Sequence, residues 1–291
     1  MAEPLFKKIV IFGVGLIGGS FALALRKAGA VAEVVGFGRS ASTLQQAQQL
    51  GIIDRIGQDI AAEVSDADLV LLATPVGQMA ELMARIAPHL GAYTIVTDGG
   101  STKSDVVRDA YAQFGGKVVQ FVPAHPIAGG EQSGAAAARA DLYIGKKVVL
   151  TPLPENPEAA VARVQAAWQV CGAVIHKLTH AEHDEVFAAV SHLPHLLSFA
   201  LVHDLAQRDN RDLLLSFAAS GFRDFTRIAA SSPEMWRDIC LSNREALLNE
   251  LQIYMAELNK ISTALAAGDS EELEQIFRAA RELRSGWNEN R

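Results

Sequence analysis

The sequence has few cysteines, no excess of positive charge and no signal-like start. Its two cysteines, Cys171 and Cys240, offer no disulfide framework and fit a reducing compartment. The formal net charge of -7 excludes a general attraction to nucleic acid or to an anionic membrane. Residues 1–5 lack the basic segment of a secretory signal. We expect a cytoplasmic protein in which any anionic ligand needs dedicated cationic side chains.

The sequence also lacks a clear membrane span and a complete metal motif. The apolar stretch from Ile9 to Leu25 falls slightly short of the ~20 residues that a span requires, and it contains a glycine turn. His192 and His195 have H-x-x-H spacing, but Pro194 lies between them. No HExxH pattern or clear third ligand accompanies them. We therefore expect neither a membrane partner nor a metal.

Short apolar runs alternate with amphipathic stretches through the first half of the chain. The predicted strands are Ile9–Phe12, Glu33–Phe37, Leu69–Ala73, Tyr93–Thr97, Val118–Val122 and Lys147–Leu150. The predicted helices between them are Gly18–Ala28, Ala41–Leu50, Gln78–Pro88 and Ser104–Gln113. Alternating strands and helices indicate an α/β fold with a Rossmann-type, doubly wound and mainly parallel sheet.

The pattern changes near residue 178. A helix from Asn156-Pro157 to Cys171 and a last strand, Ala173–Lys177, complete the first half. Little period-two alternation follows. Helix starts are predicted at Thr179 with Glu182, at Ser232-Pro233 and at Asp269 with Glu272, and apolar residues keep helical spacing over Met235–Ala266. We predict a dinucleotide-binding domain over residues 1–178 and an all-α helical domain over residues 179–291.

A glycine pattern, G-x-G-x-x-G, follows the first predicted strand. Its members are Gly13, Gly15 and Gly18, and Leu16 and Ile17 lie between the last two. Between a strand and a helix, such glycines allow a tight turn, close approach of a pyrophosphate and close helix packing. The pattern predicts a dinucleotide site; the alternative is a purely structural turn.

The end of the second strand lacks the acid that NAD-selective sites usually carry. Gly38 occupies the expected position, and Arg39 and Ser40 follow it. An arginine can form a charge-assisted pair with a 2′-phosphate, and a serine can add a hydroxyl. These residues favour NADP over NAD. The alternative is that Arg39 is a solvated surface residue and that the cofactor is NAD.

Three segments follow strand ends, where a doubly wound sheet binds its ligands. They contain Thr74-Pro75, Ser101 and His125. His125 lies between two prolines, and its ordinary pKa near neutrality suits removal of a proton from an alcohol. Ser101 is a candidate to orient it. The alternatives are a turn histidine bonded to backbone and a serine that caps the next helix.

Several blocks together resemble the prephenate/arogenate dehydrogenase family of tyrosine biosynthesis. They are Gly13–Gly19, Asp98–Lys103, His125–Gly134, Asp184, Ser191–His195, Gly221–Ala229 and Pro233–Asp238. The resemblance implies hydride removal from a ring carbinol to a nicotinamide, with loss of carbon dioxide that makes the ring aromatic. It implies that His125 accepts the hydroxyl proton, that Ser101 bonds His125, and that His195 contacts the substrate.

The same resemblance implies that Arg227 binds a substrate carboxylate, which a chain of net negative charge requires. The alternatives for Arg227 are a surface residue or an ion pair with Asp224. Trp236 is a possible pocket wall, although a tryptophan is more often part of a core. Glu131 is the candidate partner for the ammonium of arogenate, where prephenate has a keto group; its alternative is a loop acid paired elsewhere.

Two other functions remain open at this point. One is another two-domain NAD(P)-dependent hydroxyacid dehydrogenase, which would more often use a lysine base, with Lys177 and Lys260 as the nearest candidates. The other is a non-catalytic NADP-binding dimer. The leading hypothesis is an NADP-dependent dehydrogenase of arogenate and/or prephenate that forms a homodimer through its helical domain.

Overall fold

The structure is a computed structural model that describes residues 3–130 and 132–287. The chain divides into two compact units, Met1–Arg244 and Glu245–Arg291. The first contains all described strands and the helices up to residue 242. Strands give way to helices after Lys177. A domain limit at residue 178 stays a prediction.

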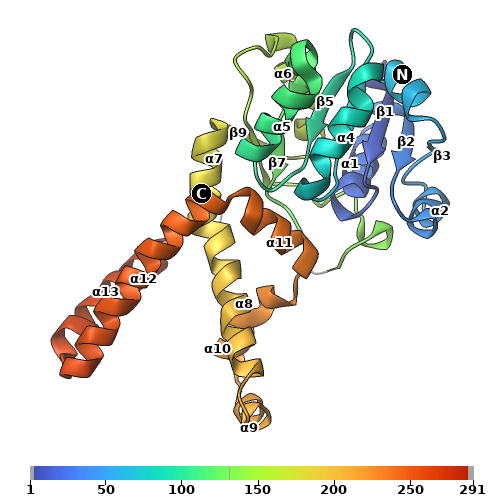
Figure 1. Cartoon of the computed structure of the whole chain (residues 1–291). Coiled ribbons are helices and arrows are strands. Elements are labelled where there is room, and N and C mark those ends of the chain that lie inside the picture. The colour runs from blue at the N-terminus through green and yellow to red at the C-terminus, as the bar shows by residue number, and fades with distance from the viewer. Residues whose placement is uncertain (1–2, 131, 288–291) are drawn as a thin grey trace. The chain divides into compact units, whose positions relative to one another are not determined.

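Six parallel strands form the main sheet of the first unit, in the order β3-β2-β1-β4-β5-β6 (Figure 1). They are β1 Phe6–Phe12, β2 Val31–Phe37, β3 Arg55–Ile56, β4 Leu69–Leu72, β5 Ile95–Asp98 and β6 Phe121–Val122. The helices of this part are α1 Leu16–Lys27, α2 Ala41–Gln49, α3 Ile60–Ser65, α4 Met79–Ile86, α5 Ser104–Phe114 and α6 Glu158–Val170. The strand order reverses beside β1, so the predicted doubly wound α/β fold is confirmed.

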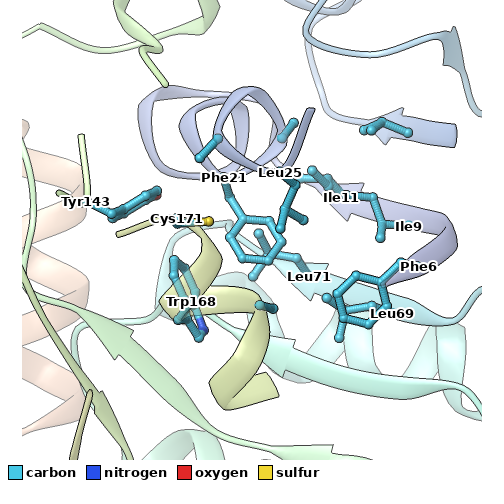
Figure 2. Close-up of a cluster of buried hydrophobic side chains, with 14 of the residues drawn as sticks. Phe6, Ile9, Ile11, Phe21, Leu25, Leu69, Leu71, Tyr143, Trp168 and Cys171 are labelled. Atoms are coloured by element: carbon cyan, nitrogen blue, oxygen red, sulfur yellow. The ribbon is translucent and has the colours of Figure 1, made fainter. Parts of the chain in front are cut away.

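Both faces of this sheet are covered, which explains the nearly continuous apolar strands. Ile9 faces a core that includes Phe21 of α1 and Trp168 of α6, whose rings are 4.6 Å apart (Figure 2). The next residue, Val10, faces a second core that includes Met83 of α4. Alternation along one strand therefore fills two separate cores.

A second sheet holds three strands in the order β7-β8-β9. They are β7 Ala124–Pro126, β8 Lys147–Leu150 and β9 Val174–Lys177. The last two were expected as strands, but they do not extend the main sheet. β7 is antiparallel to β8 and pairs His125 with Val149, so His125 lies in a short edge strand rather than in a loop. An edge tolerates Pro126, which has no N–H to donate.

The predicted strand Val118–Val122 is shorter than expected. Gly115–Gln120 forms a 3₁₀ helix, and pairing with β5 is limited to Phe121 and Val122. Gly115 has a φ of 51°, which glycine adopts without strain and which redirects the chain there. Val118 is buried even so. Its apolar character therefore reflects burial, and the prediction of a strand at this point was wrong.

Helices follow β9, as predicted. In the first unit they are α7 His180–Phe187, a π-helical segment Ala188–His192, α8 Leu193–Ala206, α9 Arg211–Ser216, α10 Ser220–Thr226 and α11 Pro233–Ser242. The capping box of Thr179 and Glu182 is present, and Ser232 caps α11. The expected continuous helical spacing over Met235–Ala266 is interrupted at Asn243, whose side chain is hydrogen-bonded to neighbouring helices.

The second unit contains most of α12, Arg244–Ala267, and all of α13, Ser270–Gly286. Asp269 caps α13 by accepting a bond from the N–H of Glu272, as predicted. Lys260 pairs with Glu272 at 2.9 Å. These contacts join the two helices of the unit.

The stretch Ile9–Leu25 forms β1, the glycine turn and most of α1. A different segment, His180–Ala206, is long and apolar enough to cross a membrane by length and composition. It is interrupted by the π-helical segment, and it carries the buried polar residues His183, Asp184 and His192. One such helix is weak evidence for a membrane span, because a core helix meets the same criteria.

Candidate active site

The glycine turn between β1 and α1 contains one tight crossing and one open position. Gly13 has a φ of 96°, and a Cβ on it would lie 2.4 Å from the carbonyl oxygen of Ala73. A Cβ on Gly18 would lie 2.3 Å from the carbonyl oxygen of Gly13. A Cβ on Gly15 would meet nothing within 4 Å. Two glycines therefore let the backbone pack closely, and the third borders open space.

This open space lies at the amino end of α1. The helix begins at Leu16, has no side-chain cap and has no acid in its first turn. The first N–H groups of a helix lack backbone partners, and they favour an anion there. The hydroxyl of Thr74, beside the turn and followed by Pro75, is buried without a hydrogen-bond partner. These features fit the pyrophosphate and adjoining groups of a dinucleotide.

Arg39 and Ser40 follow β2 as expected, but both have neighbours within the chain. The hydroxyl of Ser40 caps α2 by accepting a bond from the N–H of Thr43. The side chain of Arg39 is 72% exposed and lies 3.8 Å from the carboxylate of Glu234 at the start of α11. The sequence did not identify Glu234, because it is almost two hundred residues away in the chain.

His125 is partly exposed and joins a chain of buried polar side chains. Its Nδ1 lies 2.8 Å from Nε2 of His183 on α7. Nδ1 of His183 lies 2.8 Å from a carboxylate oxygen of Asp184. We call His125, His183 and Asp184 the histidine chain. His183 is fully buried and Asp184 is 4% exposed, so the chain leads inward from the partly exposed ring of His125.

Asp184 also holds the amino end of α5. It accepts hydrogen bonds from the backbone N–H groups of Lys103 at 2.8 Å and Ser104 at 2.7 Å. Burial alone would raise the pKa of Asp184, but its bonds with His183 and Ser104 outweigh burial and keep the pKa below its usual value. The carboxylate is therefore ionised and can only accept.

The proton positions along the histidine chain follow from this charge. Burial lowers the pKa of both His125 and His183, and neighbouring positive charge lowers it further. Neutral His183 donates from Nδ1 to Asp184 and accepts at Nε2. The proton between the imidazoles then belongs to Nδ1 of His125. Nε2 of His125 is left with a free lone pair, which is the state that a general base requires.

Ser101 lies close to the histidine chain but contacts a histidine that is not a member of it. In the part of the chain that the structure describes, no hydrogen bond joins Ser101 to His125. The backbone of Ser101 bonds His192, whose Nδ1 lies 3.0 Å from the side-chain nitrogen of Asn243. That nitrogen donates to the carbonyl oxygen of Asp184 at 2.8 Å. The role of Ser101 toward His125 stays a prediction.

The expected alternative for Ser101, a helix cap, is not observed. The helix α5 begins at Ser104, and its N-cap residue is Lys103. The carboxylate of Asp184 takes the position of a cap from a different part of the chain.

Two of the predicted substrate residues, His195 and Trp236, are in contact. His195 stacks on this ring, with centroids 3.7 Å apart and planes 18° apart, and its Nδ1 donates to the carbonyl of Ser191 at 2.8 Å. Burial lowers the pKa of His195, and the positive charge of Arg227 lowers it further, so Arg227 is nearby. Trp236 also lies 6.1 Å from the ring of His192. Glu131 lies outside the described residues.

The edge strand that carries His125 adjoins the glycine turn. A Cβ on Gly99 would lie 3.1 Å from Ile17 of the turn and 3.8 Å from Pro126, next to His125. A Cβ on Gly130 would likewise lie 3.5 Å from the side chain of Leu16. The base and the dinucleotide turn therefore border one region of the first unit, at the carboxyl ends of β1 and β5.

The sequence did not indicate His183 or Asn243 as site residues, and it indicated Asp184 only as part of the family resemblance, with no role. The capping box at Thr179 predicts the helix that carries His183, but nothing in the local pattern shows which strand its buried face meets. Over residues 3–130 and 132–287, no group of three histidine, cysteine or acidic side chains is arranged to hold a metal.

A dinucleotide turn and an adjoining neutral histidine with a free lone pair define a nicotinamide-dependent oxidoreductase with a Rossmann domain. Two family models match the chain: the nucleotide-binding domain of prephenate dehydrogenase over residues 21–177 and its dimerization domain over residues 179–279. The chain belongs to the prephenate dehydrogenase family.

Individual relatives agree with this assignment. The cyclohexadienyl dehydrogenase of Zymomonas mobilis is 36% identical over 96% of this chain and 95% of its own length. Among solved structures, prephenate dehydrogenase from A. aeolicus, in complex with hydroxyphenyl propionate and NAD+, has a TM-score of 0.90 and 36% identity, with 98% of both chains covered. Synechocystis arogenate dehydrogenase has a TM-score of 0.80 and 31% identity, covering 96% of this chain and 99% of that one.

Proposed function

We propose that this enzyme catalyses the NADP-dependent oxidative decarboxylation of arogenate and/or prephenate in tyrosine biosynthesis. One observation carries the proposal: Nδ1 of His125 is hydrogen-bonded into the histidine chain, in a strand that adjoins the dinucleotide turn, and this bond leaves Nε2 as the acceptor. The names of the relatives indicate a cyclohexadiene substrate. When bound, the nicotinamide accepts a hydride from the carbinol carbon of that substrate.

His125 supplies the matching proton transfer. Its Nε2 accepts the hydroxyl proton as the carbinol carbon is oxidised, and Asp184 stabilises the resulting positive charge through His183. Loss of carbon dioxide then returns the electrons of the broken carbon–carbon bond to the ring. As the ring becomes aromatic, the former carbinol oxygen takes the proton back from His125, so His125 ends the cycle neutral. The histidine chain, which ends in the fixed carboxylate of Asp184, suits a base that takes up a proton and later releases it.

Arg227 provides the cationic contact that a dianionic substrate needs on a chain of net charge -7. A guanidinium can hold a carboxylate with two parallel hydrogen bonds. His195 offers a second polar contact: its Nδ1 donates to the carbonyl of Ser191, so Nε2 of the neutral ring is an acceptor. Trp236 supports His195 by stacking on it.

The test is the formation of reduced cofactor, followed by absorbance, with arogenate and prephenate each paired with NADP and NAD. Turnover of either cyclohexadiene, with release of carbon dioxide, is the expected result. Simple hydroxyacids serve as controls for the rival dehydrogenase class. If these are oxidised and neither cyclohexadiene is, the proposed substrate class is wrong. If nothing is oxidised while NADP still binds, a non-catalytic dimer is the better description.

The choice between the substrates is assigned to Glu131. A carboxylate there favours the ammonium of arogenate, so Glu131→Gln should lower kcat/KM for arogenate about tenfold, which corresponds to roughly 1.4 kcal/mol. Prephenate, which has a keto group at that position, should be nearly unaffected. Equal kcat/KM values for arogenate in the variant and the parent would remove this role.

The preference for NADP is assigned to Arg39 and Ser40, because Gly38 leaves no acid to bind a 2′-hydroxyl. Arg39→Ser should lower kcat/KM for NADP roughly tenfold or more and leave NAD nearly unchanged. Glu234→Gln is the matched variant, since it removes the carboxylate that lies 3.8 Å from Arg39. It should raise kcat/KM for NADP. A strong preference for NAD in the parent enzyme would contradict the assignment.

We also propose a cytoplasmic homodimer that forms through the helical region. Exposed apolar side chains on α12 and α13 support this, because large apolar patches usually mark interfaces. They include Ile253 at 58%, Leu265 at 63% and Phe277 at 59% exposure. Sedimentation velocity of the parent and of Ile253→Asp tests the interface. A dimer in the parent and a monomer in the variant are expected, and a monomeric parent would contradict the proposal.

A further inference from the structure

Two fully buried charged residues lie behind the histidine chain and have no place in the proton transfer described above. They are Asp98 at the end of β5 and Lys103 just before α5, and both side chains are 0% exposed. The ammonium of Lys103 is hydrogen-bonded to Oδ2 of Asp98. Burying such a pair is costly, and removing one partner leaves an uncompensated charge. A pair kept at this position calls for an explanation.

The pair is bonded to the backbone beside one end of the histidine chain and to the carboxylate at its other end. Oδ1 of Asp98 accepts the backbone N–H of Ala124 at 2.9 Å, one residue before His125. The backbone N–H of Lys103 donates to Asp184 at 2.8 Å. Asp98 thereby fixes the strand that carries the base, and Lys103 fixes the carboxylate at the other end. The side-chain pair therefore ties the backbone just before His125 to the residue whose backbone N–H holds Asp184.

The ammonium of Lys103 also acts at a distance. It lies within electrostatic range of both imidazoles and lowers the pKa of His125 and of His183, after the larger effect of burial. The other groups that face these two rings are His192, which acts in the same direction, and Asp184 and Asp98, which oppose it. Lys103 is therefore the one fixed cation among these facing groups.

We propose that Lys103 is a positioning residue for the reaction: its ammonium, paired with Asp98, ties the strand that carries His125 to the segment whose backbone N–H holds Asp184, and so keeps the two ends of the histidine chain in place. Its fixed positive charge also disfavours a second cation on the two imidazoles. The base then stays neutral until a substrate hydroxyl donates to it. The ammonium of Lys103 destabilises protonated His125, so His125 returns the proton readily. This inference rests on the proposed function, since it assumes that His125 is the base.

Lys103→Met tests the proposal through the pH dependence of kcat/KM. Removing the cation makes protonation of His125 easier, and the unpaired Asp98 acts in the same direction. The acidic limb of the profile should move to higher pH by about one unit, and kcat should fall roughly tenfold. Lys103→Gln keeps a donor for Asp98 without the charge, so it should show the same shift of the limb with a smaller loss of thermal stability.

Lys8→Met is the matched control. Lys8 is 8% exposed and pairs with Glu63 at 2.8 Å and with Asp66, at the opposite end of the strands. It should lose stability with no movement of the acidic limb. If a folded Lys103→Met or Lys103→Gln variant keeps the parental limb and loses only stability, the pair is structural and the proposal fails.

NMR of the histidine ring nitrogens, recorded on the parent enzyme without substrate, measures the titration of both rings and needs neither a variant nor turnover. His125 and His183 should take up protons only at a lower pH than an ordinary histidine. Titration of either ring near its ordinary value of about 6.5 would overturn the proposal. A parent enzyme that is inactive on both cyclohexadienes but has neutral rings would instead contradict the proposed function. Identical ring titration in Lys103→Met and in the parent would contradict the charge effect of Lys103, whatever the substrate.

Discussion

The glycine turn and the histidine chain border the same region of the first unit, yet the sequence specifies them in different ways. The turn is built from Gly13, Gly15 and Gly18, within six consecutive residues. The chain joins His125 to His183 and Asp184, and its anchor Lys103 is 81 residues from Asp184. The first is a local backbone conformation; the second exists only after β7, α5 and α7 have packed together.

This difference predicts different responses to substitution. A change in the turn acts on backbone space and on the binding of one ligand. A change in the histidine chain alters proton positions, and it alters each hydrogen bond of that chain in turn. The two regions can therefore be separated by measuring kcat, cofactor KM and stability for variants in each.

The largest expected effect comes from the outer end of the histidine chain. His125→Asn removes the free lone pair at Nε2, and the loss of general-base catalysis should lower kcat by roughly 10²–10⁴-fold. Cofactor KM should change little, because the turn is intact. Stopped-flow absorbance with saturating substrate measures both quantities. Turnover equal to that of the parent would show that His125 is not the base.

The inner end of the chain should have the next largest effect. Asp184→Asn has only one acceptor oxygen, so it cannot accept from Ser104 on one side and from Lys103 and His183 on the other. It also removes the negative charge that fixes the order of protons on the two imidazoles, and kcat should fall about 10²-fold. Glu182→Gln is the control on the same helix, because glutamine also serves in a capping box. Steady-state kinetics of both variants compare them. Equal rates for Asp184→Asn and the parent would separate the chain from catalysis.

The buried histidines also predict how stability depends on pH. Burial lowers the pKa of His192 from 6.5 to about 4. As the pH falls below about 6.5, the unfolded chain takes up a proton that the folded chain refuses until about pH 4. Stability is therefore complete above pH 6.5 and is lost between these values, by on the order of 3 kcal/mol for this group.

Urea unfolding at pH 7 and pH 5 measures this loss. His192→Gln should be less stable at pH 7 but should depend less on pH. His89→Gln, at an exposed position, is the control and should keep the parental pH dependence. An unchanged slope for His192→Gln would contradict the assignment of this loss to His192.

The smallest effect is expected in the glycine turn. Gly15→Ala meets no atom within 4 Å, so the protein should fold normally while the added methyl enters the space assigned to the pyrophosphate. Cofactor KM should rise about tenfold, roughly 1.4 kcal/mol, with kcat largely kept. Gly13→Ala should instead reduce stability, since its Cβ would lie 2.4 Å from a carbonyl oxygen. Equal stability losses for both would undo the distinction.

Much of the fold could be predicted because strands and helices have local signatures. Lys147–Leu150 was predicted with its observed limits, and Thr179, Ser232 and Asp269 cap helices as their spacing indicates. The second sheet could not be predicted, because strand order depends on pairing partners far apart in sequence. The prediction of a strand failed at Val118 because a buried residue of a 3₁₀ helix and a strand residue have the same apolar character.

The candidate site divides along the same line. The sequence by itself determined the glycine turn, the absence of an acid after β2 and the position of His125 between two prolines, since each depends on neighbouring residues. Only the tertiary structure decided that His183 rather than Ser101 contacts Nδ1 of His125, and that Asp184 caps α5. The reason is physical: a hydrogen bond about 3 Å long needs its partners fixed in space, and no local pattern records which buried faces will meet.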